Sequence, residues 1–229
     1  MLQQTQVSRV VEKYHLFLKA FPTVNTLAQA SLADVLVQWS GLGYNRRAKF
    51  LKAAAETVVI EHKGRFPKTV EGLLSLPGVG PYTARAVAAF AYNTPDAFIE
   101  TNIRSVYIHH FFHDQVSICD VELLPIIAAT LDTTKPREWY WALMDYGSFL
   151  KVSGNKVHRK SAHYAKQSKF DGSRRQVRGM LLKLLTQAPA TAFVLSKAIE
   201  KNSALVIDVL VDLEREGFVM QKRKKYMIK

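Results

Sequence analysis

Residues 76–106 read LPGVGPYTARAVAAFAYNTPDAFIETNIRSV, and this stretch decides the fold. Gly78 and Gly80 flank a tight hairpin, and Pro81 follows at the first position of a new helix, where its missing N–H costs nothing. Glycine adopts positive φ without a Cβ clash, so the N–H groups of the hairpin and of the first helical turn can face an anion. The stretch therefore predicts a helix N-terminus that binds phosphate.

A buried helix and an acidic residue follow the hairpin. From Tyr82 to Ala91 the residues are mostly small and apolar, which indicates a helix packed inside a bundle. A turn over residues 93–96 comes next, and Glu100 then stands in an otherwise apolar stretch. Glu100 is therefore the first candidate for a catalytic carboxylate.

The composition of the whole chain favours a nucleic-acid partner. The 229 residues carry a formal net charge of +13, which predicts binding to a polyanion, and a hydrophobic content of 48% is ample for a packed core. The sequence has no run of about 18 apolar residues and no signal segment after Met1, so we expect a soluble intracellular protein of the cytoplasm or nucleoid. Cys119 is the only cysteine, so the chain cannot build a disulfide or a cysteine-ligated cluster by itself.

Helical periodicity extends on both sides of the hairpin. Apolar residues recur at helical spacing from Leu2 to Phe21 with no capping residue ahead of them, so we expect residues 1–21 to continue a helix that starts upstream of Met1. Further helices are expected at residues 26–30, from a Ser31 cap through Trp39, and at Arg46 through Glu61, Val70 through Leu76, Asn102 through His110, 121–131 and 136–150. Thr101 or Asn102 can cap the helix after Glu100.

The loop between Trp39 and Arg46 contains two glycines together with Leu42 and Tyr44. A Gly-rich loop that exposes one apolar and one aromatic side chain suits insertion into a base stack. The alternative is an ordinary helix end followed by core residues. The residues alone leave both interpretations open.

Four motifs share one order along the chain. They are Met1-Leu2-Gln3-Gln4-Thr5-Gln6-Val7, Gly41-Leu42-Gly43-Tyr44, Gly78-Val79-Gly80-Pro81-Tyr82-Thr83 and Leu143-Met144-Asp145-Tyr146-Gly147. With the acidic residue that follows the hairpin, this pattern resembles the helix-hairpin-helix DNA glycosylase superfamily, which includes endonuclease III. Its branch of MutY-type adenine glycosylases is the most similar, over roughly residues 1–165.

The resemblance implies catalytic roles for Glu100, Tyr82 and Asn102. Cleavage of the bond between base and deoxyribose places positive charge on the sugar, and a nearby carboxylate stabilises that charge. The family more often has aspartate at the position of Glu100. By the same resemblance, Tyr82 hydrogen-bonds to Glu100, and Asn102 fixes the water or the carboxylate. The alternatives are that Glu100 caps the helix near Asn102 or pairs with Arg104, and that Tyr82 is a packing residue.

Tyr82 also stands where bifunctional members of the family have lysine. A phenol is a poor nucleophile at neutral pH, so we expect a monofunctional glycosylase. The family carries a catalytic glutamate two residues before the position of Met1, which normally supplies the proton to departing adenine. We therefore expect the natural protein to begin upstream of Met1.

The resemblance implies several contacts with DNA as well. Gln4 corresponds to a glutamine that the family inserts into the gap left by the extruded base, whereas the alternative is an exposed helical residue. The expected DNA-binding residues are Gln4, Leu42, Tyr44, Arg46, Gly78, Val79, Gly80, Lys156, Arg159 and Lys160.

Residues 151–175 contain eight Lys or Arg residues against one Asp. In the resembled family this region usually carries four cysteines that hold a [4Fe–4S] cluster, and here it carries none, so we expect no such cofactor. Its charges, among them Lys156 and Lys166, suggest that the basic loop persists without the cluster. A solvated linker is the alternative.

Residues 174–229 predict a winged helix, with helices near 177–185, 193–200 and 204–216 and a hairpin around residues 221–224. The third helix carries four outward carboxylates, which disfavours the reading of bases. The carboxylates belong to Asp208, Asp212, Glu214 and Glu216. Phosphate contact through Lys222, Arg223 and Lys224, or a role in protein binding, is expected instead.

The sequence therefore predicts an all-α protein, with a helix-hairpin-helix glycosylase domain over residues 1–170 and a winged-helix-like domain over residues 171–229. We expect it to bind, as a monomer, double-stranded DNA with a mismatched or oxidised base pair, and to remove adenine opposite 8-oxoguanine or guanine. The alternatives are a thymine or uracil mismatch glycosylase and an inert DNA-binding protein.

Overall fold

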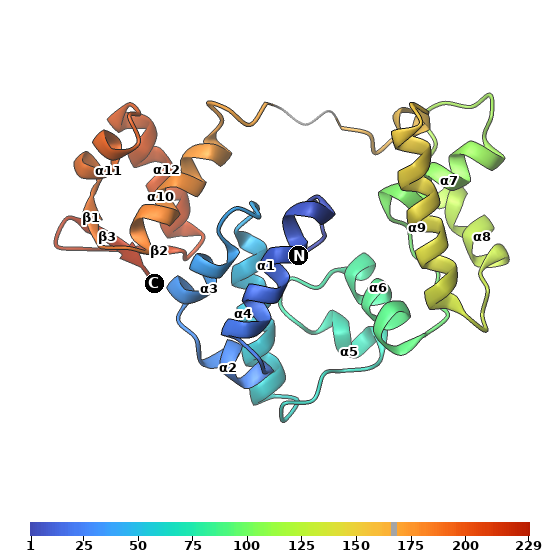
Figure 1. Cartoon of the computed structure of the whole chain (residues 1–229), viewed down its shortest axis with the longest axis horizontal. Coiled ribbons are helices and arrows are strands. Elements are labelled where there is room, and N and C mark those ends of the chain that lie inside the picture. The colour runs from blue at the N-terminus through green and yellow to red at the C-terminus, as the bar shows by residue number, and fades with distance from the viewer. Residues whose placement is uncertain (166–168) are drawn as a thin grey trace. The chain divides into compact units, whose positions relative to one another are not determined.

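The computed structural model describes residues 1–165 and 169–229 (Figure 1). These residues are largely helical, as predicted, with one three-stranded sheet near the C-terminus. Backbone contacts divide the chain into two compact units. Unit 1 contains residues 1–66, residues 76–78 and the C-terminal segment that ends at Lys229, and unit 2 contains residues 67–75 and the segment that begins at Val79. None of the helices in the described ranges combines the length and apolar composition of a membrane span.

Unit 1 begins with four helices. They are α1 (Val7–Ala20), α2 (Val24–Gln29), α3 (Leu32–Trp39) and α4 (Arg46–Ile60). The prediction that Ser31 caps a helix through Trp39 is confirmed, because the Ser31 side chain accepts a hydrogen bond from the Asp34 N–H. Thr23 caps α2 in the same way through the Thr26 N–H.

The expectation that residues 1–21 form one helix from their first residue is wrong. The helix starts at Val7, and residues 1–6 form a turn that contains the positive φ of Gln4, 58°. Thr5 is buried in this turn, and its hydroxyl donates to the Leu42 carbonyl at 3.1 Å. The prediction counted Leu2 as a core-facing residue of the helix, whereas Leu2 is exposed and lies outside the core.

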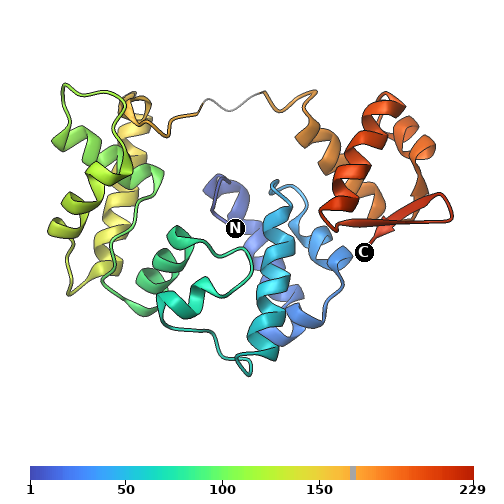
Figure 2. The same cartoon turned by 180° about the vertical axis from the view of Figure 1, so that it is seen from behind.

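The C-terminal part of unit 1 is a winged helix, as predicted (Figure 2). Its elements are α10 (Arg174–Leu185), β1 (Ala190–Thr191), α11 (Ala192–Ala198), α12 (Ser203–Arg215), β2 (Val219–Lys222) and β3 (Lys225–Ile228). The strand order is β1-β3-β2, and both pairs are antiparallel. The two-residue strand β1 was not predicted, since two residues carry no periodicity.

One hydrophobic cluster joins the two halves of unit 1. Buried residues of α1 and α3, such as Phe17 and Trp39, belong to the same cluster as Leu181 of α10 and Leu210 of α12. Residues 171–229 therefore share a core with the N-terminal helices. The division of the chain into domains of residues 1–170 and 171–229 implies that each folds independently, and it stays a prediction.

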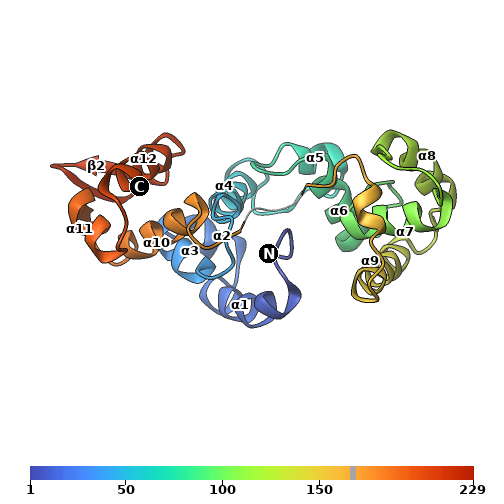
Figure 3. The ribbon, with the colours of Figure 1, turned by 90° about the horizontal axis from the view of Figure 1, so that it is seen from above.

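Unit 2 contains both helices of the hairpin motif and a bundle (Figure 3). Its helices are α5 (Val70–Leu74), α6 (Pro81–Tyr92), α7 (Thr101–Phe111), α8 (Asp120–Thr130), α9 (Pro136–Val152) and the 3₁₀ helix η1 (Val157–Lys160). Helices α7 and α9 pack against each other most extensively, around the fully buried Ile103 and Tyr140. The core of this bundle supports the N-terminus of α7, where Glu100 lies.

Candidate active site and DNA interface

Glu100 is the N-cap residue of α7. Its backbone is extended, and its Oε2 accepts a hydrogen bond from the Asn102 N–H at 2.6 Å. The capping role that the sequence left open is therefore present, whereas Thr101 and Asn102 do not cap the helix. Glu100 therefore lies at the positive end of the helix dipole, where a negative charge interacts favourably with the helix. The backbone thus holds Glu100 in place.

Arg104 does not pair with Glu100. Its guanidinium donates two hydrogen bonds to the Asp120 carboxylate, at 2.7 and 2.8 Å. These bonds hold the pKa of Asp120 below its ordinary value. Because Arg104 is engaged by Asp120, no cation of α7 neutralises Glu100 among the residues that the structure describes.

Tyr82 lies at the second position of α6, half-buried against Phe98, with ring centroids 5.9 Å apart. Burial raises the pKa of Tyr82 to about 12, and the charge of Glu100 adds to the shift. In the described part of the chain the phenol forms no hydrogen bond with Glu100, so the interaction between them is electrostatic. Tyr82 is therefore neutral at physiological pH and unsuited to nucleophilic attack.

Two buried aromatic residues fix the segment that leads to Glu100. Phe98 and Tyr140 stack with ring centroids 4.0 Å apart. The Tyr140 hydroxyl donates to the Asp96 carbonyl at 2.9 Å and accepts from the Phe98 N–H at 3.4 Å. Tyr140 of α9 therefore binds the backbone two and four residues before the carboxylate, a role that the sequence did not reveal.

Gly147 of α9 lies against the backbone of Asn102, two residues after Glu100. A Cβ built on Gly147 would lie 2.3 Å from the carbonyl oxygen of Asn102 and 2.7 Å from its Cα. Only glycine allows α9 to approach the first turn of α7 this closely. The sequence motif contained Gly147, but only the helix contact reveals that it touches the candidate catalytic residue Asn102.

Gln4 and Tyr44, the two residues expected to enter the DNA, both lie in unit 1 with positive φ, 58° and 46°. Both are exposed. For residues other than glycine this backbone region is strained and persists only where surrounding contacts impose it. Several side chains supply these contacts, and Arg47 supplies the most.

Arg47 binds both segments at once. Its guanidinium donates to the carbonyls of Met1 (2.7 Å), Leu42 (3.2 Å) and Gly43 (3.2 Å) and to the Thr5 hydroxyl (2.8 Å). It also donates to the Gln3 carbonyl, and it lies over the rings of Trp39 and Tyr44. Burial lowers the pKa of Arg47. The sequence did not single out Arg47, because an arginine in the first turn of a helix resembles a solvated one.

The expectation that Leu42 is an exposed wedge is wrong. Leu42 is 2% exposed and belongs to the core cluster of unit 1. Its burial follows from Gly41 and Gly43, whose φ values of 89° and 73° turn the loop so that Leu42 points inward. Tyr44, 37% exposed, stays at the surface, and its hydroxyl accepts a hydrogen bond from Arg175 at 3.3 Å.

The hairpin has the expected backbone. Gly78 has φ 76°, and a Cβ there would meet the Phe50 ring at 2.5 Å, so the residue needs glycine on both counts. Gly80 is the N-cap of α6 and, as expected, Pro81 takes the first helical position. No side chain caps this helix, and Val79 is partly exposed beside it. Arg46 is exposed at the start of α4, with its guanidinium 5.8 Å from the centre of the Phe50 ring.

The basic loop of residues 155–162 packs against the bundle of unit 2, which argues against a solvated linker in this part. Ile118 and Ser161 form a parallel bridge, Val157 is buried, and the Lys160 ammonium donates to the His113 carbonyl at 2.6 Å. Lys156 and Arg159 are exposed, whereas Lys160 is partly buried. Lys166 lies outside the described residues.

The chain does not fit a [4Fe–4S] cluster, because Cys119 is its only cysteine. No group of three His, Cys, Asp or Glu side chains with metal-binding geometry occurs within residues 1–165 and 169–229. The loop is held instead by the backbone pairing at Ile118 and Ser161.

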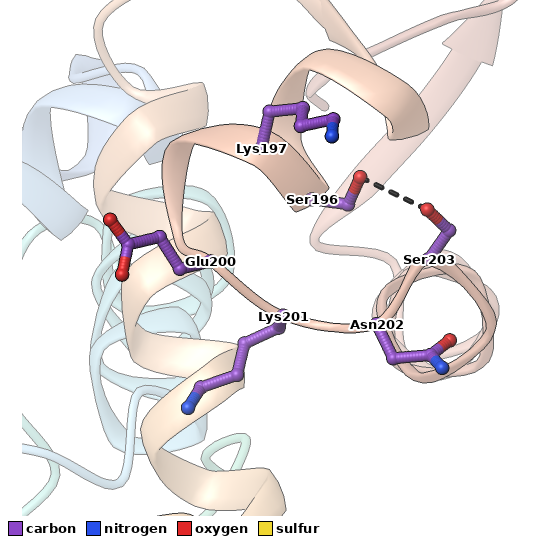
Figure 4. Close-up of a pocket in the computed structure, with 6 residues that line it drawn as sticks. All are labelled: Ser196, Lys197, Glu200, Lys201, Asn202 and Ser203. Atoms are coloured by element: carbon purple, nitrogen blue, oxygen red, sulfur yellow. Dashed lines mark hydrogen bonds between the residues drawn. The ribbon is translucent and has the colours of Figure 1, made fainter.

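The winged helix contains a hollow of about 510 Å³ between α11 and α12 (Figure 4). It is lined by Ser196, Lys197, Glu200, Lys201, Asn202 and Ser203. The Ser203 hydroxyl donates to Ser196 at 3.1 Å, and the lining contains one carboxylate, of Glu200, and two lysines. None of the predicted site residues lines this hollow.

Comparisons with known proteins identify the family of this chain. A sequence model of the HhH-GPD superfamily of base excision DNA repair proteins matches residues 1–123. An adenine DNA glycosylase of Mycolicibacterium smegmatis is 34% identical over 95% of this chain and 83% of the relative. The human adenine DNA glycosylase is 36% identical over 65% of this chain but only 28% of its own length.

Solved structures show the same fold. A thermostable thymine-DNA glycosylase covers 64% of this chain and 69% of its own, with a TM-score of 0.56 and 24% identity. A non-covalent endonuclease III–DNA complex covers 64% of this chain and 67% of its own, with a TM-score of 0.52 and 18% identity. Identities this low support the fold and no more.

The fold and the relatives define the class of helix-hairpin-helix DNA glycosylases, enzymes that cleave N-glycosidic bonds. The chain belongs to the HhH-GPD superfamily of base excision DNA repair proteins, and within it to the adenine DNA glycosylase type. These findings confirm the family, the fold class and the enzymatic activity expected from the sequence.

Proposed function

We propose that this enzyme removes adenine paired with 8-oxoguanine or guanine, with Glu100 as the group that stabilises the sugar cation. The observation that carries the proposal is the position of Glu100. Its carboxylate is fixed by the Asn102 N–H at the positive end of α7, beside a neutral Tyr82. A preorganised charge of this kind stabilises a cationic transition state without reorganisation during the reaction.

In this reaction no amine of the enzyme forms a covalent bond with the sugar. As the bond between adenine and C1′ breaks, both bonding electrons leave with the base, and water then adds to C1′ and loses a proton. The phenol of Tyr82 is neutral during this step and does not attack the sugar. Asn102 positions Glu100 through its backbone N–H rather than through its side-chain amide. The product is an abasic site, and the strand stays intact.

Adenine must leave the helix before Glu100 can reach its sugar. Extrusion of a base costs a few kcal/mol of stacking and pairing, which inserted side chains offset. Gln4 and Tyr44 serve this purpose, since both are exposed on strained backbone that Arg47 holds. The hairpin of Gly78, Val79 and Gly80 binds phosphate through its N–H groups, and exposed Arg46, Lys156 and Arg159 bind the strand electrostatically. Lys160 is used structurally.

Departing adenine needs a proton, and the resemblance to MutY-type glycosylases implies that a glutamate two residues before the position of Met1 supplies it. The test is therefore single-turnover base release by this chain and by the chain extended upstream in its reading frame. The duplexes carry A opposite 8-oxoguanine, A opposite G, T opposite G and U opposite G. Glu100→Gln, which keeps the size of the side chain and removes its charge, is the control.

We expect adenine release from the first two duplexes, fastest in the extended chain and lost in Glu100→Gln. Release of thymine or uracil instead would show that the substrate assignment is wrong. Binding to all four duplexes without release of any base, in both chains, would show that the protein is an inert DNA-binding member of the superfamily.

A further inference from the structure

The turn between β2 and β3 concentrates positive charge. Lys222, Arg223, Lys224 and Lys225 are consecutive and exposed, and we call these four residues the wing. Arg223 and Lys224 form the turn with φ 49° and 66°, while Lys222 and Lys225 are directly paired across the two strands. Like charges placed opposite each other are destabilising. Among the described residues no carboxylate forms an ion pair with any of the four, so the wing keeps its full charge for a partner.

The packing beneath the wing holds it in one place. Val219 and Tyr226 are buried in the core of unit 1, and β3 is paired on both sides, with β1 and with β2. The Gln221 N–H donates to the Glu214 carboxylate at 3.1 Å, which ties the base of the wing to α12. Figure 2 shows the hairpin, in red, extending away from the helices of the winged helix. The charges are therefore presented on a fixed scaffold.

Helix α12 differs from the wing because its acidic residues are already paired. Arg174 of α10 binds both Asp208 and Asp212, and Arg215 also binds Asp212. Between these carboxylates the helix exposes the aliphatic side chains of Ile207 and Val211. A surface of aliphatic groups and paired carboxylates offers few hydrogen-bond donors for base edges, so α12 is unsuited to the reading of bases in a groove.

We propose that the wing is a second DNA-binding site, which contacts the phosphate backbone of double-stranded DNA without sequence preference. Four exposed cations at a single turn, without an ion pair among the described residues, have the charge to contact the phosphates of a strand. The site goes beyond base excision, because it adds affinity for undamaged duplex and thereby lengthens the time that the enzyme stays on DNA. The base-excision machinery contains none of the wing residues.

The test compares two double variants that remove equal charge from the winged helix. Arg223→Asn with Lys224→Gly removes two wing charges and installs an Asn-Gly turn, the sequence preferred for two-residue hairpins with positive φ. Lys197→Ala with Lys201→Ala removes two charges from the hollow of Figure 4. Equilibrium affinity for an undamaged duplex is measured for both variants over a range of salt concentrations, and thermal unfolding confirms that each is folded.

Each phosphate contact contributes about 0.9 to the slope of log affinity against log salt, so the wing variant should lower the slope by about 2. The hollow variant should leave the slope at the wild-type value. Equal slopes in the two variants would overturn the proposal and leave α12 and its exposed Ile207 and Val211 as a surface for a protein. Because the assay involves no catalysis, its result is independent of whether adenine is released.

Discussion

Gly147→Ala should disable the enzyme through the position of Glu100. The added Cβ would lie 2.3 Å from the Asn102 carbonyl oxygen, whereas ordinary contact begins near 3.4 Å. The neighbouring atoms are backbone at the start of α7, so no side chain can rotate to make room. The helix start, with the Asn102 N–H that holds Glu100, must therefore move by about 1 Å.

A displacement of about 1 Å in a catalytic group typically lowers the rate by about 100-fold. Overpacking of a core also destabilises a protein, by roughly 1–3 kcal/mol. Single-turnover adenine release should therefore fall by about two orders of magnitude at a temperature where the variant is still folded. Affinity for a duplex that carries an abasic analogue should change little, because Gln4 and Tyr44, the residues that we propose enter the DNA, lie in unit 1.

Gly179→Ala is the matched control. Gly179 also lies inside a helix, and nothing lies within 4 Å of a Cβ built there. Removal of a helical glycine at such a site should stabilise the protein by about 0.5–1 kcal/mol and leave the rate unchanged. A Gly147→Ala variant as active as Gly179→Ala would refute the argument that close helix approach positions Glu100.

Three further predictions concern single side chains. Arg47→Lys keeps the charge but lacks the planar guanidinium that reaches several carbonyls. Affinity for an abasic-analogue duplex, measured by fluorescence anisotropy, should therefore fall by about 10-fold or more. An affinity equal to that of the wild type would contradict the role of Arg47 in holding the two segments. Tyr82 has a pKa of about 12, so its ionisation should cause no change in the rate of base release up to about pH 10.5. A change of rate below this pH that Tyr82→Phe abolishes would show that Tyr82 titrates during turnover. The pKa of Asp120 is lowered, so its ionised form stabilises the fold above the ordinary carboxyl range, and this stabilisation is lost as the pH falls. Acid should therefore lower the Tm of the wild type more than the Tm of Asp120→Asn. An equal decrease in Tm would contradict the role of Arg104.

The sequence predicted the parts of the site that local chemistry determines. Gly78, Gly80 and Pro81 require a hairpin and a helix start, and Glu100 stands out as an acid among apolar residues. Both features follow from residues close to each other in the chain. The helix boundaries of unit 2 were close to the predicted ones for the same reason.

The parts that depend on distant contacts could not be read from the sequence. Leu42 is buried because Gly41 and Gly43 turn it toward helices elsewhere in the chain. Arg47 acts on residues 1–5, some forty positions away, and Gly147 acts on Asn102. Nothing in the local pattern distinguishes these two residues from a solvated arginine and a helical glycine with open space around it.

The measurement that tests the central claim most directly is the binding of a transition-state analogue. A duplex with a cationic pyrrolidine in place of the adenine nucleotide, opposite 8-oxoguanine, is compared with one that carries a neutral tetrahydrofuran. The cation needs no proton donor for a leaving base, so only the stabilisation of sugar charge is measured. Analogues of this kind bind at least about 100-fold tighter than substrate. We predict such a preference for the cation in the wild type and almost none in Glu100→Gln, whereas an equal preference in both proteins would contradict the role of Glu100.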